Sequence, residues 1–278
     1  MLLEFTTAFQ YYRIGQPATQ ATKNRFLMTL QRVLEERLPS DLGVSVKSLA
    51  VREDNRIHIS LEGTRKDDCA FVSNLLKELT GEIRPFSQIA VGDKFHGTFR
   101  SVGKVGFGLF VDGGIEQPSK EILIPLHALR EQLTSNEKIP LQEIIHQYGL
   151  MDYLPVEIEI TKIEKPFSKD FKSDTTYESG FRIEAKFAEE YLATIRGWVE
   201  SGLEIILAVG TPRQGIKRVI AKRGHSLDIL EIQRLGPLES ALVCKEGTRA
   251  SGIIAHVGKY LPECRFALIN PSRLKWTF

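Results

Sequence analysis

Residues 91–126 read VGDKFHGTFRSVGKVGFGLFVDGGIEQPSKEILIPL, and this stretch decides the fold. Apolar and polar side chains alternate along it, so Phe107, Leu109 and Val111 are expected on one face and Phe110 on the other. Glycines punctuate the segments at Gly92, Gly103, Gly106, Gly108, Gly113 and Gly114. Short alternating segments broken by glycine predict strongly curved antiparallel strands that coil into a small barrel.

Two more strands and a helix complete the predicted barrel, which we place at residues 90–188. Residues 154–160 alternate cleanly, with an apolar side chain at every second position. Residues 181–187 alternate in the same way and form the last predicted strand. The connection over residues 127–153 is longer than a turn and contains a helical stretch at 141–148. The sequence therefore predicts a barrel with a helical insertion after its third strand.

The parts on either side of the barrel are predicted to be small α+β domains. Residues 1–86 read as a strand, a helix, a strand hairpin and a second helix. Residues 189–278 read as a helix followed by the order βαββαβ. Both orders are those of ferredoxin-like sandwiches, so we expect a multidomain α+β chain whose barrel is flanked by two such sandwiches. The fold alone implies no function for either flank.

The composition is that of a globular protein without a strong charge bias. The 278 residues are 42% hydrophobic and 26% charged, and 37 basic against 35 acidic residues give a net charge of +2. Any surface for nucleic acid must therefore be local. Three cysteines without a CxxC pair favour a reducing compartment, and no apolar run approaches the ~18 residues of a membrane span. We expect a cytoplasmic protein without a membrane partner.

The order VGDxxxG, FGxFVD and LIPL in the central stretch resembles the S1 group of OB-fold domains. This resemblance implies an S1-like OB barrel in which Phe107 and Phe110 offer flat rings to the bases of RNA. Many S1 domains carry a histidine in the third strand, where Pro125 stands here. One of the usual stacking rings is therefore missing.

The whole chain also resembles an uncharacterised archaeal protein family with a central S1-like domain. The stretches that carry this resemblance are VGFGLFVD at 105–112, IPLH at 124–127, RGHSLDI at 223–229 and GKYLP at 258–262. The resemblance implies no activity, because the family is defined by sequence and not by function.

Basic residues occupy the loops and strand ends that border the ligand face of an OB barrel. Basic side chains contact phosphates while rings stack on bases, and each stacked base contributes about 1 to 3 kcal/mol. The predicted RNA-binding residues of the barrel are Phe107, Phe110, Arg100, Lys104, Lys162, Lys165, Lys169 and Arg182, with Lys172 in the same loop. A second basic region, at residues 213–234, adds Arg218 and Lys222 on one face of a predicted helix. These two fit RNA phosphate, an acidic protein or a solvated helix face.

No catalytic residue, metal or cofactor is predicted. His225, Cys244, His256 and Cys264 lack the short spacing of metal ligands, and the sequence has no phosphate-binding glycine loop or nucleophile motif. We therefore expect a non-catalytic RNA-binding factor that takes single-stranded or structured RNA and joins a ribosome or RNA polymerase assembly. Two alternatives stay open: a protein-interaction scaffold with incidental RNA contact, and an RNA-processing enzyme with an S1-like substrate arm.

Overall fold

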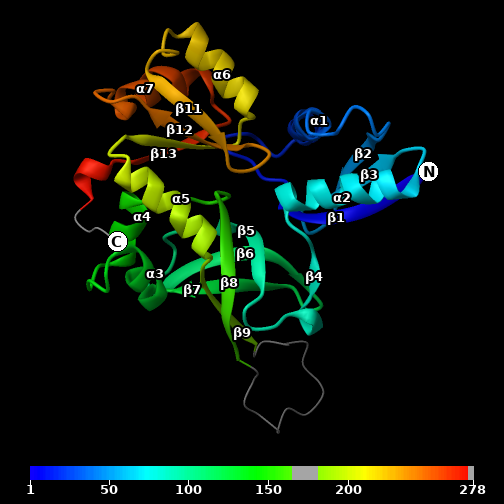
Figure 1. Cartoon of the computed structure of the whole chain (residues 1–278), viewed down its shortest axis with the longest axis horizontal. Helices are drawn as coiled ribbons and strands as arrows, with labels where there is room; N and C mark the ends of the chain where they lie inside the picture. The colour runs from blue at the N-terminus through cyan, green and yellow to red at the C-terminus, as the bar shows by residue number, and fades with distance from the viewer. Residues whose placement is uncertain (165–180, 275–278) are drawn as a thin grey trace.

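A closed barrel of five strands forms the middle of the chain, and a small antiparallel sheet adjoins it from each end of the sequence (Figure 1). The computed structural model of the chain describes residues 1–164 and 181–274. The predicted mixed α+β chain with a central barrel is confirmed. Among the described residues, no helix combines the length and the apolar character needed to cross a membrane.

The barrel is built from the stretches that alternate in sequence. Its strands are β5 (Lys94–Arg100), β6 (Gly108–Glu116), β7 (Lys120–Pro125), β8 (Pro155–Glu164) and β9 (Arg182–Phe187). Pairing runs β5–β6–β7–β9–β8 and returns to β5, with β7 and β9 parallel and the other pairs antiparallel. Helices α3 (Leu126–Leu133) and α4 (Leu141–Gln147) lie in the connection between β7 and β8. The strands curve tightly because glycine permits close approach: a Cβ atom on Gly97 would lie 2.6 Å from the carbonyl oxygen of Asp112.

The N-terminal part is a three-stranded sheet with two helices. Its elements are β1 (Leu2–Gln10), α1 (Gln20–Glu35), β2 (Ser45–Val51), β3 (Arg56–Glu62) and α2 (Lys66–Thr80), and the strand order is β1–β3–β2. Helix α2 ends at Gly81, whose φ of 75° is easily reached without a side chain. The chain then forms β4 (Arg84–Pro85), which pairs with β6 of the barrel and not with the N-terminal sheet.

The C-terminal part is a four-stranded sheet that is covered on both faces. Its elements are α5 (Glu189–Glu200), β10 (Ile205–Val209), α6 (Arg213–Lys222), β11 (Ile229–Arg234), β12 (Glu239–Cys244), α7 (Ala250–Val257) and β13 (Arg265–Ile269). The strand order is β11–β12–β10–β13, and each neighbouring pair is antiparallel. Helices α6 and α7 cover one face, while α5 packs Leu192 and Ile195 into the core on the other (Figure 1). Because α5 also contacts β8, it joins this sheet to the barrel.

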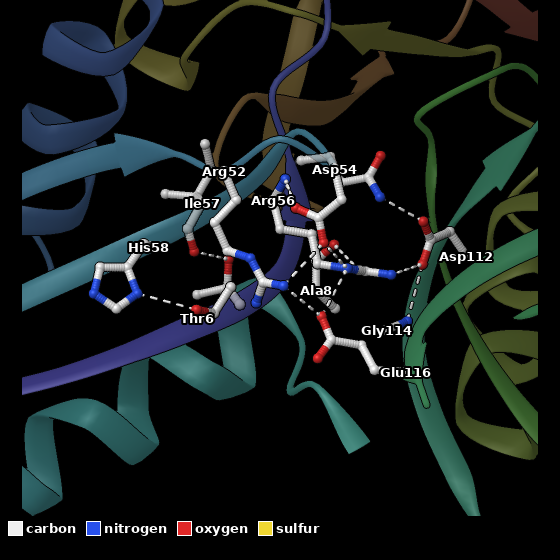
Figure 2. Close-up of polar contacts among 12 residues, drawn as sticks. Thr6, Ala8, Arg52, Asp54, Arg56, Ile57, His58, Asp112, Gly114 and Glu116 are labelled. Atoms are coloured by element: carbon white, nitrogen blue, oxygen red, sulfur yellow. Dashed lines mark hydrogen bonds and ion pairs between the residues drawn. The ribbon is translucent and has the colours of Figure 1, made fainter. Parts of the chain in front are cut away.

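A network of charges centred on the buried Arg56 joins the N-terminal part to the barrel (Figure 2). Arg56 at the start of β3 is 3% exposed, and its guanidinium donates a hydrogen bond of 3.1 Å to a carboxylate oxygen of Asp112 on β6. Gln10 donates to the other oxygen of Asp112 at 2.6 Å. Arg52 pairs with Glu116 of β6 at 3.2 Å. The network holds β1 against β5 and β6, which decides how much of the barrel surface stays accessible.

Candidate nucleic-acid interface

Two phenylalanine rings form an aromatic surface where β6 begins. Phe107 is 55% exposed, and Phe110 is half-buried. Their ring centroids lie 6.0 Å apart, with an angle of 89° between the ring planes. Because one ring of an edge-to-face pair meets the other only through its edge, the pair can still offer a flat face to a base.

Phe107 lies outside the alternation of its strand. The sequence pattern predicts it on the same face as Leu109 and Val111, but these two are buried and Phe107 is exposed, so that prediction is wrong. The physical reason is that β6 starts only at Gly108, where a Cβ atom would lie 2.4 Å from the carbonyl oxygen of Ile124. The backbone lies close against β7 at this glycine, and Phe107, which precedes the strand, is left exposed.

Arg100 lies beside the rings, but its charge is already engaged within the protein. It is the cross-strand partner of Phe110, and its side chain is 18% exposed. The guanidinium lies 4.9 Å from the ring centroid of Tyr153 and 3.7 Å from a carboxylate oxygen of Asp112. Arg100 therefore borders the ring surface, and Asp112 offsets much of its attraction for a phosphate.

Lys104 is exposed in the loop that leads into the rings. This loop is braced by α4, because the side-chain amide of Gln142 donates to the carbonyl oxygen of Gly103 at 2.9 Å. Lys104 and Arg100 also act on Glu121 of β7: burial raises the pKa of the Glu121 carboxyl, Asp112 raises it further, and the two cations partly offset that rise. We call the surface formed by Lys104, Phe107 and Phe110 the ring patch.

The remaining basic residues predicted on the barrel are farther from the rings. Strand pairing places five residues in one row around the barrel: Arg100, Phe110, Leu123, Glu184 and Lys162. Lys162 pairs with Glu164, and Arg182 pairs with Glu184 at 3.0 Å. Both cations are exposed but each already has a carboxylate partner. Lys165, Lys169 and Lys172 lie outside the described residues, so their part in a binding surface stays a prediction.

The N-terminal part covers the middle of the same barrel face. A Cβ atom on Gly114 of β6 would lie 2.8 Å from the Cβ of Ala8 on β1. Asp112 follows the FGLFV run in sequence, and it receives hydrogen bonds from Gln10 and Arg56 of the N-terminal part. The accessible aromatic surface on these strands is consequently confined to the ring patch.

Sequence reasoning missed two residues that shape this surface. Asp112 lies in a recognised sequence motif, but its partners come from the N-terminal part and could not be read from that motif. No sequence pattern pointed to Tyr153, which stacks on Tyr12 with ring centroids 4.4 Å apart and has the Arg100 guanidinium over its ring. Contacts between such distant segments are not encoded in local periodicity.

Arg218 and Lys222 lie on α6 in the C-terminal part, so the structure does not bring them to the ring patch (Figure 1). Both are exposed, while Ile216 and Ile220 of the same helix are buried, as the predicted helix face requires. Arg218 lines a cleft that α6 shares with α1. Over residues 1–164 and 181–274, no group of three or more His, Cys, Asp or Glu side chains is placed to hold a metal ion.

Comparison with known proteins places the chain in one family. Residues 89–199 match the DUF2110 central domain, and residues 203–269 match the DUF2110 C-terminal domain. The first match takes in the barrel and most of α5, and the second begins just before β10. No curated protein matches the chain. The two matches together cover more than half of the residues, and the chain therefore belongs to the DUF2110 family, a domain-of-unknown-function family.

Proposed function

We propose that the protein is a non-catalytic RNA-binding factor whose ring patch contacts single-stranded RNA. The observation that carries this proposal is an exposed ring, Phe107, paired edge-to-face with Phe110 beside the exposed Lys104. Rings that stack on bases next to cations that contact phosphates are the usual means of binding single strands. The choice of RNA over DNA rests on the resemblance to S1 domains alone.

We further infer that the barrel is an S1-like OB domain. Its closed order β5–β6–β7–β9–β8 and the helices between its third and fourth strands support this. The C-terminal order β13–β10–β12–β11 within a βαββαβ unit supports a ferredoxin-like sandwich. The N-terminal sheet supports the same fold with one strand fewer, because β4 pairs with the barrel.

The small size of the ring patch predicts weak binding by the isolated protein. Two rings at about 1 to 3 kcal/mol per stacked base and the single exposed cation Lys104 provide limited free energy. Binding becomes effective when a partner holds the RNA nearby, because the second contact is then intramolecular. This reasoning favours action within a larger RNA-containing assembly, such as a ribosome or a transcribing RNA polymerase.

The proposal is tested by titrating fluorescently labelled single-stranded oligouridylate against the wild type and a Phe107→Ala/Phe110→Ala variant. We expect the variant to lose at least about tenfold in affinity, since two stacking rings are removed. Phe71→Ala is the matched control, because Phe71 is 57% exposed on α2, away from the barrel. Equal affinity of the double variant and the wild type, or binding that does not weaken with salt, would contradict the proposal.

A protein-interaction scaffold is the second candidate, and one observation favours it. Leu227 is 78% exposed and Leu230 is 62% exposed, and Leu230 lies on β11 at the edge of its sheet. An edge strand with exposed apolar side chains is a common docking site for another chain. Affinity purification after nuclease treatment separates the candidates: partners that persist without RNA, and are lost in Leu227→Asp/Leu230→Asp, support the scaffold.

A further inference from the structure

A cleft of about 540 Å³ lies between the N-terminal and C-terminal parts, with α1 on one wall and α6 on the other. The two helices come from opposite ends of the sequence and approach each other away from the strands that carry the ring patch (Figure 1). A volume of this size is typical of ligand sites, which often form where domains meet. The cleft is therefore a second place at which this molecule can bind.

The floor of the cleft is held together by close contacts between the two parts. A Cβ atom on Gly15 would lie 3.2 Å from the carbonyl oxygen of Pro262, and one on Gly210 would lie 3.0 Å from Cδ1 of Ile14. Tyr12 is buried beneath the cleft and donates its hydroxyl hydrogen bond to Glu239 of β12. These contacts position the two walls before any ligand arrives, which reduces the entropy lost on binding.

The charges on the walls do not balance. Four arginines line the cleft, namely Arg13, Arg25, Arg32 and Arg218, against the carboxylates of Glu36 and Glu263. Arg25 and Glu263 neutralise each other across the cleft at 2.5 Å. Within the described part of the chain, the side chains of Arg32 and Arg218 have neither an ion pair nor a hydrogen bond. Each wall thus carries an arginine that is free to bind an anion.

Three further arginines, Arg37, Arg213 and Arg234, lie near one another behind the walls. The pKa of Arg234 is lowered by burial and by its neighbours Arg37 and Arg213, while Glu36 partly offsets the fall. Among the described residues, the buried Nη1 atom of Arg234 has no hydrogen-bond partner. The Nε of Arg213 donates to the carbonyl oxygen of Ile232 at 2.7 Å, which turns this cation toward β11. Arg37, Arg213 and Arg234 do not line the cleft, but their positive charge adds to the potential that favours an anion there.

We propose that the cleft is a phosphate-binding site in which Arg32 of α1 and Arg218 of α6 hold the phosphate group from two sides. Guanidinium groups match phosphate geometry because their parallel N–H bonds can engage two oxygens at once. Tyr260 lines the same cleft and is 38% exposed, and Arg223 lies 3.4 Å from its ring centroid, which adds a ring and a further cation near the wall. The phosphate belongs either to an RNA strand or to a free mononucleotide. The site needs neither ring of the ring patch, so it stands apart from the function proposed above.

The test compares wild type with an Arg32→Gln/Arg218→Gln variant of the full chain. Three probes are titrated: inorganic phosphate, uridine monophosphate, and labelled single-stranded oligouridylate over a range of salt concentrations. The matched control is Lys47→Gln/Arg65→Gln, which removes the same net charge from exposed positions outside the cleft. Urea unfolding of each variant checks that the fold is retained.

We expect the cleft variant to bind at least one phosphate probe about tenfold more weakly than wild type, while the control changes little. Loss of mononucleotide and phosphate binding identifies a free nucleotide as the ligand. Loss of RNA binding alone, with a salt slope reduced by about 0.7 for each lost phosphate contact, identifies an RNA strand.

Three outcomes overturn the proposal: wild type binds none of the probes, the cleft variant binds like wild type, or it weakens no more than the charge-matched control. The ring-patch variant Phe107→Ala/Phe110→Ala keeps the two ideas separate. Mononucleotide binding should survive in it, because Arg32 and Arg218 are intact. If only the ring-patch variant loses RNA binding, the ring patch is the RNA site, and the cleft proposal stands only if the cleft variant loses mononucleotide or phosphate binding. If only the cleft variant loses RNA binding, the ring-patch proposal fails and the cleft proposal stands.

Discussion

The two flanking parts differ in how far charge contributes to their attachment to the barrel. The N-terminal part combines apolar contacts, such as the stack of Tyr12 on Tyr153, with a charge network in which Arg56 is buried against Asp112 of β6. The C-terminal part is joined through apolar side chains of α5, among them Leu192 and Ile195, which pack into the shared core. A buried ion pair sets orientation but adds little net stability, because desolvation offsets the attraction, whereas apolar burial contributes roughly 25 cal/mol per Å². The comparison teaches that the charges of the N-terminal attachment mainly set its orientation, whereas the apolar contacts of the C-terminal attachment contribute more to the free energy of unfolding.

The sheets reflect the same difference. Every residue of β10 and of β12 is buried, because helices cover both faces of the C-terminal sheet. In β2 of the N-terminal sheet, Val46 is the only buried residue. The N-terminal sheet also lacks a fourth strand, since the segment after α2 pairs with β6. The N-terminal part therefore depends on the barrel for structure that the C-terminal part supplies for itself.

Among the variants of the charge network that test this comparison, we expect the largest loss of stability at Arg56. We expect Arg56→Ala to lower the free energy of unfolding by about 3 kcal/mol, because the largely buried Asp112 loses its nearest cation and keeps only Arg100 at 3.7 Å. Urea unfolding measures this. Arg52→Ala is the control: its side chain is 42% exposed, so its ion pairs should contribute less than about 1 kcal/mol.

A double variant sharpens the same point. Replacing both charges, as in Arg56→Met/Asp112→Leu, should recover part of the lost stability, since the carboxylate that lost Arg56 is removed, while Arg100 gives up its partner. If the double variant is as unstable as Arg56→Ala, then the network contributes through hydrogen bonds to other groups, and the view of it as mainly an orienting device is wrong.

The apolar attachment is tested at Ile195, which is 2% exposed on α5. Ile195→Ala removes buried methyl groups and leaves a cavity, and we expect a loss of about 3.5 kcal/mol. This loss should be nearly independent of salt concentration and of pH. A strong dependence on either would show that charges, and not packing, secure the C-terminal part.

The contact between the flanking parts themselves should respond to pH. Burial raises the pKa of the Glu239 carboxyl to about 7. Hydrogen bonds that Glu239 accepts from Tyr12 and from the Leu238 N–H lower this pKa and partly offset the rise. The folded state therefore binds this proton more tightly than the unfolded chain, and the stability that it provides is complete below about pH 4.5 and is lost as pH rises through 7. The loss from this group amounts to at most about 3 to 4 kcal/mol.

Glu239→Gln isolates that effect. The Gln side chain resembles the protonated acid, because it can accept one hydrogen bond and donate another to the Tyr12 oxygen. Urea unfolding at pH 5 and pH 8 should show a smaller fall for the variant than for wild type. An identical fall in both proteins would mean that Glu239 does not titrate in this range.

The smallest expected effect on stability is at the ring patch. Phe107→Ala should change the free energy of unfolding by less than about 0.5 kcal/mol, because the ring is largely in solvent. Thermal unfolding monitored by circular dichroism measures this. A loss of 2 kcal/mol or more would indicate that the ring supports the barrel, and its exposure would then no longer argue for a ligand.

Local pattern predicted a good part of this architecture. The alternation at residues 154–160 appears as β8, and the glycine at position 81 ends α2 with a positive φ. The face of Phe107 was predicted wrongly, because where β6 begins depends on the close approach of β7 at Gly108. The predicted role of Arg100 was incomplete for a similar reason: its neighbours Asp112 and Tyr153 come from separate segments.

The sequence by itself determined most strands and helices, the central barrel and the presence of rings beside basic residues, but not α3 or the pairing of β4. It did so because periodicity and glycine placement act over a few residues along the chain. Only the tertiary structure decided that β1 covers part of the barrel, that Arg56 lies buried against Asp112, and that α1 and α6 enclose an arginine-lined cleft. These features bring together segments more than fifty residues apart, and their geometry follows from packing and desolvation that no local pattern records.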